Sequence, residues 1–388
     1  MVEGDDRSDN AAAKRSGRKG NSYPLPVRKF RRILFLIPII LFFAFAEIIN
    51  WLCLLLDEIF YRSYKKIKII SPVFIIGMPR TGSTYLHNLL YNDMERFSSM
   101  KLWEMLFCPS VIQKKVARLL FSSTSFMNSC IMRGIRKLDR FMFRKYQTVH
   151  HSGLFYIEED DYLLLHILAS HTLLFMFPEI KRFRALTRFD ELVSEKRKRR
   201  IISFYRKGIQ KHMMVYGNGR KYLSKCPPNT SKIDSLLAKF DGIRFICLFR
   251  EPEDTIPSTI NFLLRLSQIY YSPLDLQTIR EQVLETADHL YAYPLEKLTT
   301  RSRHEFIVAG YKQVTRKPEW LIENIYKRFG YSMNEEYREK IRSEQQTANK
   351  YRSSQQHPPE KFGLTSGELE SRFKKPIEEL TKLSEYAN

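Results

Sequence analysis

Cysteine is scarce in this chain of 388 residues, and its distribution excludes two common kinds of site. The five copies are Cys53, Cys108, Cys130, Cys226 and Cys247. Their number is odd, so they cannot all pair within the chain, and their spacing matches no zinc motif. The sequence is therefore not that of a disulfide-stabilised scaffold or a zinc protein, and we predict no metal site.

Lysine is missing from the one position where a nucleotide triphosphatase needs it. Gly77 and Gly82 have the spacing of the motif G-x-x-x-x-G-K-[ST], but Ser83 stands at the lysine position. The nearest cation is Arg80, inside the loop. Because no lysine is placed to reach a γ-phosphate, a P-loop kinase or other nucleotide-binding protein is only the alternative interpretation.

Acidic residues are outnumbered by basic ones, 42 against 64, and the formal net charge is +22. Such a balance suits an acidic partner, which could be nucleic acid, anionic lipid or a polyanionic cofactor. The basic residues are dispersed and no nucleic-acid-binding motif accompanies them, so we expect no nucleic acid partner. Two clusters, at residues 28–32 and 65–68, flank an apolar segment and fit an anionic membrane face.

One long apolar run, over residues 33–56, separates a polar N-terminus from the rest of the chain. We predict that residues 1–27 are disordered, because they are polar and charged. The run is long enough to span a bilayer, and residues 28–62 would form a hydrophobic membrane-anchor helix. Glu47 and Asn50 are the exceptions within it, since both are costly in the middle of a bilayer.

Three arrangements fit this apolar segment. A signal anchor that spans the membrane once fits the basic residues before it. A helix in the membrane plane fits Glu47 and Asn50. A cleaved signal peptide fits least, because 32 residues precede the run. We expect a single-pass or membrane-associated protein, in the Golgi or another endomembrane if the source is eukaryotic, and we favour spanning over the in-plane arrangement.

Residues 65–388 have the pattern of an α/β domain. We predict strands over residues 73–76, 221–224, 244–249 and 304–310. We predict helices over residues 83–91, 110–145, 158–175, 195–214, 317–329 and 334–346, and another from about Glu253. Strands that alternate with helices indicate a parallel sheet covered on both faces. The expected fold class is α/β, with a P-loop-like central parallel sheet and an N-terminal hydrophobic helix.

The most informative stretch is the strand over residues 73–76 and the loop after it. The strand is continuously apolar, as a fully covered strand should be. Glycines in the loop allow a tight turn and the close approach of a ligand. Charge and hydroxyl groups then reach a helix N-terminus, where free backbone N–H groups favour an anion. They come from Arg80, Thr81, Ser83 and Thr84.

Two more basic residues follow predicted strands. Arg250 comes directly after the strand over residues 244–249, at the edge where α/β sheets bind ligands. Ser258 lies eight residues on, near the binding end of the next helix, so the pair could hold a second phosphate. Lys225 follows the strand over residues 221–224 and could reach the same crevice.

Four motifs, in order, resemble those of a known family. They are Gly77–His87, Leu102-Trp103-Glu104, Lys225-Cys226-Pro227, and Phe249–Pro252 with Ser258. Their order and spacing resemble those of sulfotransferases that use 3′-phosphoadenosine 5′-phosphosulfate, in the branch with a P-R-[TS]-G-[TS]-T loop. The resemblance covers roughly residues 65–375 and implies a sulfotransferase domain that moves a sulfuryl group to a hydroxyl or amine without a metal. A non-catalytic binding protein of this kind is a further alternative.

The resemblance implies a role for each matched residue. It assigns the 3′-phosphate to Arg250 and Ser258, and places Lys225 near the phosphosulfate bridge. Cys226 replaces the serine that usually follows this lysine, which removes one hydroxyl group. The 5′-phosphosulfate is assigned to the loop residues Arg80, Thr81, Gly82, Ser83 and Thr84.

Sulfuryl transfer also needs a base to take the proton of the acceptor. Glu104 is the first choice, because related bacterial enzymes place a catalytic glutamate at this spacing. His87 is a rival, and His150 and His151 are weaker candidates. The acidic run Glu158–Asp161 is interpreted as the first turn of a helix, with substrate orientation as the alternative.

The acceptor is not specified by the sequence. Aromatic residues in the helical region suit a lipid, sterol or phenol, and a basic surface would equally suit an anionic glycan. We therefore expect a small-molecule, lipid or glycan acceptor. Asn229-Thr230-Ser231 is a glycosylation sequon, which has meaning only in a lumenal domain. The aromatic residues are Phe121, Phe126, Phe141, Phe143, Phe155, Phe175 and Phe177.

Overall fold

A computed structural model describes residues 25–122, 133–137, 139–140, 153–178, 180–269, 275–350 and 357–385. Three predictions lie outside these residues: disorder over residues 1–24, much of the helix predicted beyond residue 122, and the roles of His150 and His151. Residues 25–27 were grouped with the disordered segment and belong to a helix instead.

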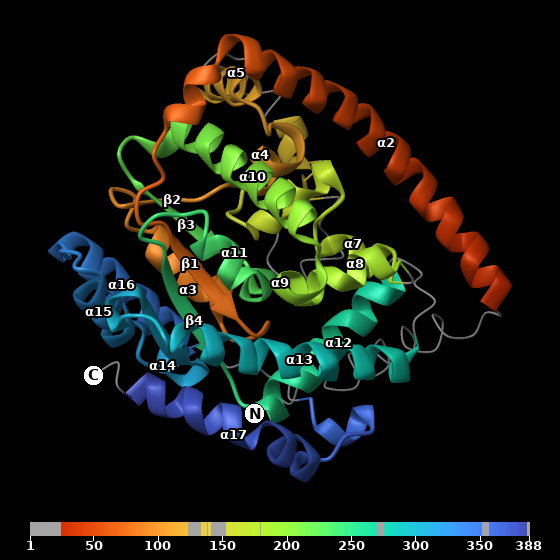
Figure 1. The fold of residues 1–388 in the computed structure, drawn as a ribbon, viewed down its shortest axis with the longest axis vertical. Helices are drawn as coiled ribbons and strands as arrows, with labels where there is room; N and C mark the ends of the chain where they lie inside the picture. The colour runs from red at the N-terminus through yellow and green to blue at the C-terminus, as the bar shows by residue number, and fades with distance from the viewer. Residues whose placement is uncertain are drawn as a thin grey trace, which may run out of the picture.

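The described part of the chain contains a five-stranded parallel sheet with the order β2-β3-β1-β4-β5 (Figure 1). This confirms the predicted α/β class, and four of the strands are those expected. β2 was missed, because two residues are too few to produce a recognisable pattern. The strands are β1 Val73–Gly77, β2 Phe97–Ser98, β3 Lys221–Lys225, β4 Arg244–Phe249 and β5 Phe306–Gly310.

Helices cover both faces of this sheet. The longer α-helices are α2 Leu25–Phe60, α3 Ser83–Tyr91, α5 Val111–Ser122, α10 Glu195–His212, α12 Pro252–Ile269, α13 Leu276–Leu298, α15 Pro318–Phe329, α16 Glu335–Lys350 and α17 Ser366–Glu385. The shorter ones are α4 Leu102–Phe107, α7 Thr172–Met176, α8 Lys181–Arg184, α9 Phe189–Leu192, α11 Ile233–Leu237 and α14 Tyr311–Arg316. Short 3₁₀ or π segments occupy Arg62–Lys66, Asp160–Ile167, Ala185–Arg188, Met213–Gly217, Pro227–Lys232, Arg303–Glu305 and Pro359–Phe362.

The central strand β1 divides the hydrophobic core in two. Val73 and Ile75 pack into a cluster with residues of α3, α15 and α16. Phe74 and Ile76 point the other way, into a larger cluster with residues of α10, α11 and α13. This alternation follows from the two-residue period of a strand. All of these positions are apolar because helices cover both faces, so the sequence shows a continuous run.

The predicted helix over residues 158–175 is wrong. Asp160–Ile167 forms a 3₁₀ segment, Leu168 then takes a left-handed conformation (φ 52°), and α7 begins only at Thr172. Asp160 and Asp161 are buried, with 2% and 3% of their surfaces exposed. They form internal hydrogen bonds and ion pairs, and the pattern of an acidic first turn was misleading for that reason.

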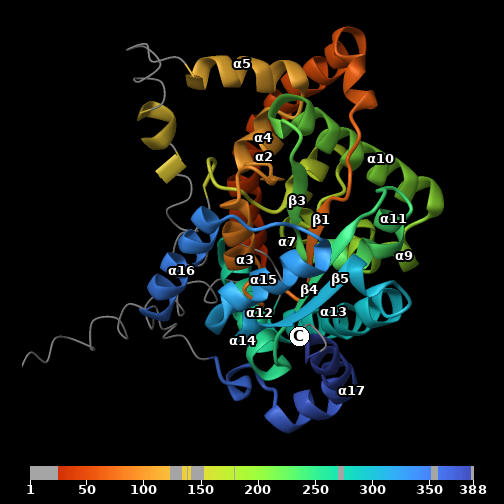
Figure 2. The same ribbon diagram turned by 90° about the vertical axis from the view of Figure 1, so that its left-hand side faces the viewer.

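The helix α2 begins three residues earlier and ends two residues earlier than predicted, and it lies along the outside of the domain (Figures 1 and 2). Its span Arg32–Phe60 is long and apolar enough to cross a membrane, with a mean hydropathy of 2.5. The helix nevertheless contacts the domain near both of its ends. Asp57 pairs with Lys211 of α10, and Arg32 donates to the carbonyl of Met176 in α7.

Candidate active site

The loop after β1 forms at the carboxyl edge of the sheet, where a glycine is indispensable. Gly77 has a φ of 118°, and a Cβ added to it would lie 2.0 Å from the carbonyl oxygen of Leu248 in β4. The Thr230 hydroxyl accepts from the Gly77 N–H at 2.7 Å and donates to its carbonyl at 3.1 Å. No other residue could occupy this position without moving a strand, so the start of the loop is rigid.

The rest of the loop leads into the N-terminus of α3. Gly82 takes the left-handed conformation (φ 79°) just before α3, and no side chain caps the helix. Arg80 also has a positive φ of 66°, which is uncommon for a residue with a side chain and often marks a functional site. The Thr81 hydroxyl donates to the Met78 carbonyl at 2.8 Å and so stabilises the loop. The helix N-terminus therefore keeps its backbone N–H groups free for an anion.

Arg80, Arg250 and Ser258 are far apart in the sequence but meet above this loop. The Nε of Arg80 donates to Ser258 Oγ at 3.2 Å. Arg250 donates from Nη1 to the backbone carbonyl of Arg80 at 3.4 Å, and its guanidinium lies 4.1 Å from the centroid of the Tyr311 ring. The Arg80 guanidinium in turn lies 5.9 Å from the ring centroid of Phe262. These contacts orient both guanidinium groups.

The positive charge at this point is only partly balanced. Arg80 is exposed to solvent, yet partial burial of its guanidinium lowers its pKa, and the nearby Arg250 and Arg265 lower the pKa further. Arg250 pairs with Asp254 at 3.1 Å, whereas Arg80 has no carboxylate partner among the described residues. Clustered like charges are unfavourable without an anion, so the arrangement is suited to bind one.

Lys225 lies at the same edge, on the neighbouring strand. It ends β3 beside Ile75 of β1, and the N–H of Cys226 donates to the Ile75 carbonyl at 3.1 Å. Burial lowers the pKa of Lys225, but Glu159 and Glu158 outweigh that effect and raise it. The Nζ of Lys225 donates to Glu159 Oε1 at 3.0 Å. One third of the Glu159 side chain remains exposed, so this carboxylate connects a buried cation with the solvent-accessible surface.

Glu104 does not pair with any of these anchor residues. It is buried in α4, where it pairs with Lys114 at 3.1 Å and with Nδ1 of His212 at 2.8 Å. Its burial raises its pKa, but Lys114 and His212 more than compensate and lower the pKa to about 2. The second ring nitrogen of His212 hydrogen-bonds to Ser98, which pairs with the beginning of β3. Glu104 is thus linked through His212 and Ser98 to the strand pair β2–β3, and not to Lys225.

His87 belongs to α3 and is buried, with 1% of its surface exposed. Its Nε2 lies 3.0 Å from Ser99 Oγ, and that hydroxyl donates to the Leu223 carbonyl at 2.6 Å. Because the hydroxyl proton of Ser99 is used in this way, His87 is the donor. Burial, and to a lesser degree Lys225, lowers the pKa of His87 well below its usual value, so the ring is neutral.

Several residues of this site were not recognised from the sequence. Glu159 was grouped with its acidic neighbours, and only its contact with Lys225 distinguishes it. Arg265, Phe262 and Tyr311 act on the two anchoring arginines from distant parts of the chain. The one available signal was that Phe262 and Arg265 follow Ser258 by one and two turns, respectively, on the same helix.

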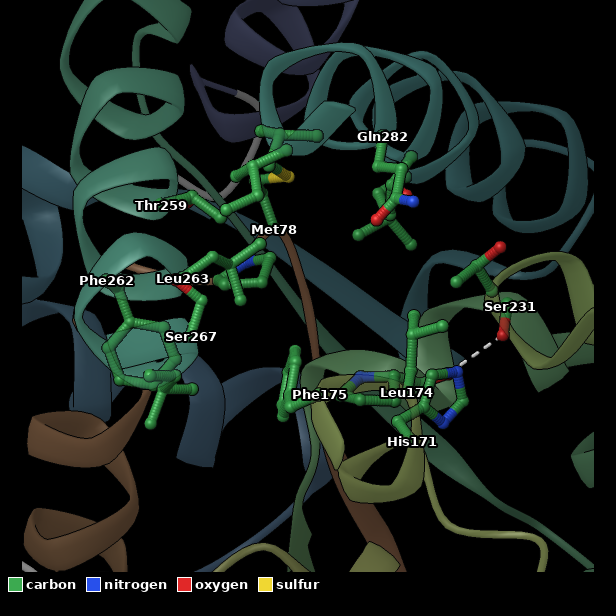
Figure 3. Close-up of a pocket in the computed structure, with 18 residues that line it drawn as sticks. Met78, His171, Leu174, Phe175, Ser231, Thr259, Phe262, Leu263, Ser267 and Gln282 are labelled. Atoms are coloured by element: carbon green, nitrogen blue, oxygen red, sulfur yellow. Dashed lines mark hydrogen bonds between the residues drawn. The ribbon is translucent and has the colours of Figure 1, made fainter. Parts of the chain in front are cut away.

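An apolar cavity of about 160 Å³ adjoins the loop (Figure 3). Met78 and Pro79 of the loop form part of its wall, and Phe262 is shared with the surroundings of Arg80. The remaining walls come mainly from α7, α12 and α13 and include Leu174, Phe175, Leu263, Leu266, Ile279 and Leu290. A cavity of this size accommodates a group as large as one aromatic ring.

Two further sequence features can be placed. Among the described residues, no group of three or more His, Cys, Asp or Glu side chains could hold a metal ion. Asn229 of the sequon is 2% exposed, donates to the Tyr205 hydroxyl and accepts from Lys232. The folded chain therefore presents no accessible amide for a glycan at this position.

Comparison with known proteins agrees with this geometry. The model of a family described as "Sulfotransferase family" matches residues 72–335. The chain belongs to the sulfotransferase family. The match includes the loop after β1, Lys225, Arg250 and Ser258 of this sulfotransferase family member. A comparison with curated proteins finds no match.

Two solved structures of sulfotransferases share the fold of this family member. Sulfotransferase STF9 from Mycobacterium avium aligns with a TM-score of 0.71 and 17% identity, and the alignment covers 92% of this chain and 88% of that one. Sulfotransferase STF1 from Mycobacterium tuberculosis H37Rv aligns with a TM-score of 0.60 and 17% identity, and the alignment covers 81% of this chain and 79% of that one.

Proposed function

We propose that this chain transfers a sulfuryl group from 3′-phosphoadenosine 5′-phosphosulfate to a hydroxyl or amine of an apolar small molecule or lipid. The observation that carries the proposal is the partly unbalanced pair Arg80 and Arg250, held together beside Ser258. Lys225 lies across the same edge of the sheet, on the strand next to β1. Two cationic positions at one edge suit a cofactor with two anionic ends.

The residues present fit this cofactor. The rigid turn at Gly77, Arg80 and the uncapped N-terminus of α3 would hold the 5′-phosphosulfate, with the hydroxyls of Ser83 and Thr84 beside it. Arg250 and Ser258 would hold the 3′-phosphate. The cofactor, when bound, supplies an activated sulfuryl group and a phosphate that can leave. Thr81 contributes indirectly, because its hydroxyl already holds the Met78 carbonyl.

Lys225 and Glu159 suit the proton and charge requirements of the transfer. A protonated Lys225 stabilises negative charge as it develops on the leaving phosphate, and its raised pKa keeps it protonated. The partly exposed carboxylate of Glu159 can accept the proton of the acceptor. We therefore propose Glu159 as the base. Glu104 and His87 remain untested predictions, and both are buried away from the accessible surface.

The cavity beside the loop supports an apolar acceptor. Its walls are mostly aliphatic and aromatic, and it meets the anchor residues through Met78, Pro79 and Phe262. A small apolar group bound there would lie next to the phosphosulfate loop, which brings the reacting groups together. A glycan would find few hydrogen-bonding groups in this cavity.

Calorimetric binding of adenosine 3′,5′-bisphosphate tests the anchors. Arg80→Ala and Arg250→Ala should each weaken binding by roughly 10- to 100-fold, since each removes a charge-assisted hydrogen bond to a phosphate. Arg301→Ala is the matched control, because this exposed arginine pairs with Glu305 away from the loop. ATP with Mg²⁺ should not compete.

Incubation of the wild-type protein with labelled cofactor and separate lipid and glycan extracts then identifies the acceptor by the mass of an added sulfate. Unchanged binding in both arginine variants would show that the anchors are wrongly assigned. Sulfated glycan without sulfated lipid or phenol would contradict the apolar acceptor.

A further inference from the structure

The helix α2 buries its polar residues and exposes its apolar ones, the reverse of a helix in a soluble protein. Arg32, Asn50 and Asp57 are 8%, 1% and 0% exposed. The opposite face presents Ile33, Leu34, Ile37, Ile40, Leu41, Phe42, Phe45, Ile48, Leu52, Leu55, Ile59 and Phe60 to the outside. An apolar stripe of this length is far beyond the isolated exposed side chains of ordinary surfaces.

The buried polar residues attach α2 firmly at its C-terminal end. The Asp57 carboxylate accepts from the backbone N–H of Val111 at 2.8 Å and of Ile112 at 3.2 Å, at the N-terminus of α5. It also pairs with Lys211 Nζ at 2.7 Å, and both side chains are almost fully buried. Loss of either partner would leave a buried charge without compensation.

Further contacts continue along the same face of the helix. Asn50 donates to the Leu106 carbonyl at 3.1 Å and accepts from Gln113 at 2.8 Å. Glu47 Oε1 lies 2.7 Å from Nδ1 of His166. Near the N-terminal end, Arg32 donates to the Met176 carbonyl. Both strongly polar side chains of the apolar run, Glu47 and Asn50, thus form hydrogen bonds or ion pairs with the domain.

This attachment is incompatible with a helix that spans a bilayer. Arg32 and Asp57 are 25 residues apart, which corresponds to about 37 Å of helix, longer than a hydrocarbon core of about 30 Å. If α2 spanned the membrane in this form, the domain surface beside it would also lie in hydrocarbon. If α2 alone spanned the membrane, the contacts of Arg32, Glu47 and Asn50 with the domain would have to break.

We propose that α2 lies in the plane of a membrane, with its exposed apolar face in one leaflet of anionic lipid and the domain resting on its other face. Charge complementarity supports this occupant, because basic residues flank the apolar stripe at residues 28–32 and 62–68 and the net charge is +22. Trp51, which is 41% exposed, suits the boundary between headgroups and acyl chains.

Flotation of the full chain with vesicles tests this proposal. The wild type should float with vesicles of phosphatidylcholine and phosphatidylserine. With vesicles of phosphatidylcholine alone in high salt, the amount of protein that floats should be at least tenfold lower. The triple variant Ile48→Glu, Leu52→Glu, Leu55→Glu should lose flotation by at least tenfold. Leu192→Glu on α9 is the matched control, because this leucine is as exposed as Leu52 and should leave flotation unchanged. Thermal unfolding confirms that both variants are folded.

Protease protection in sealed microsomes then separates in-plane from spanning. Tags at the N- and C-termini should be digested together or protected together, because both ends lie on one side of the membrane. Opposite behaviour of the two tags would overturn the proposal in favour of a spanning helix. A wild type that does not float and is dimeric by light scattering, with a monomeric triple variant, would overturn it in favour of a second copy on the same face.

Discussion

Glu104 and Glu159 both lie close to basic side chains, yet their surroundings suit them to different tasks. Glu104 is buried between Lys114 and His212, which hold its pKa at about 2. Glu159 has one basic partner, Lys225, and retains contact with solvent. A carboxylate that must take up a proton during each turnover needs access to the acceptor, and of the two only Glu159 is partly exposed.

Glu159→Gln should lower kcat by about 10²- to 10⁴-fold and leave the affinity for adenosine 3′,5′-bisphosphate unchanged, because a base acts on the acceptor. Release of the bisphosphate from the cofactor in the presence of a phenolic acceptor measures the rate, and calorimetry measures the affinity. Glu104→Gln should instead lower stability, since it leaves Lys114 and His212 buried without a counter-charge.

The opposite pattern would assign the base to Glu104: an active Glu159→Gln protein and a folded, inactive Glu104→Gln protein. A pH–rate profile separates the two cases further. Loss of a base removes the rise in rate on the acidic side of the profile, whereas loss of a structural ion pair leaves its shape intact.

The anchoring residues could be predicted from the sequence because their positions follow local rules. Arg80 lies in a glycine-bounded loop, and Arg250 directly follows a strand, so each position is specified by its neighbours. The pairing of Glu159 with Lys225 joins residues 66 apart, and nothing near either residue indicates it. Contacts of this kind depend on the assembled fold.

Among the helices, α3, α10, α15 and α16 were predicted closely, whereas α13 and α17 were not predicted and the helix predicted after Glu158 is wrong. The run Asp160–Ile167 has acidic residues followed by leucines, which is typical of a helix start. The acids instead satisfy buried partners, among them Tyr205, Tyr222 and Lys232. The α2 helix was similarly ambiguous, because hydropathy averages over its faces and does not reveal that Glu47 and Asn50 share one face with Asp57.

The attachment of α2 can be tested through stability. Asp57→Ala should lower the free energy of unfolding by about 3–5 kcal/mol, because it leaves Lys211 buried without a partner. Glu336→Ala is the control and should cost much less than Asp57→Ala, since the Glu336–Lys340 pair is exposed. Urea unfolding of both proteins in the same detergent measures the difference. Equal costs would mean that the Asp57–Lys211 pair does not hold α2 to the domain.

On the scale of the whole molecule, the buried carboxylates make stability depend on pH in opposing directions. Burial raises the pKa of Asp160 to about 6, although hydrogen bonds from Tyr205 and Tyr222 act against it. Asp160 therefore destabilises the fold once it ionises, and this penalty appears as pH rises from about 4 to 6. Asp161 behaves in the opposite way, because Lys232 and His171 outweigh its burial and lower its pKa.

Asp160→Asn removes the ionisation and keeps an oxygen for the two tyrosine hydroxyls. The melting temperature of the variant relative to that of the wild type should rise between pH 4 and 6 and then level off. Subtraction of the two profiles cancels the contributions of the other titrating groups. A difference that is constant over this range would show that Asp160 is already ionised at pH 4 in the folded protein.

The positions of α2 and the cavity are also related. Arg32 of α2 contacts the end of α7, and Leu174 and Phe175 of the same short helix line the cavity. A leaflet against α2 would lie close to the wall of the proposed acceptor site. An apolar acceptor dissolved in the membrane would then have a short path to the anchors.

The bond between Asp57 and Lys211 has a consequence for biosynthesis, because its partners are 154 residues apart. At 5–20 residues per second, a ribosome needs roughly 8–30 s to make the intervening chain. For that time α2 exists as an apolar segment with no domain to pack on. A targeting factor or a membrane therefore has time to capture the helix before its polar face is covered.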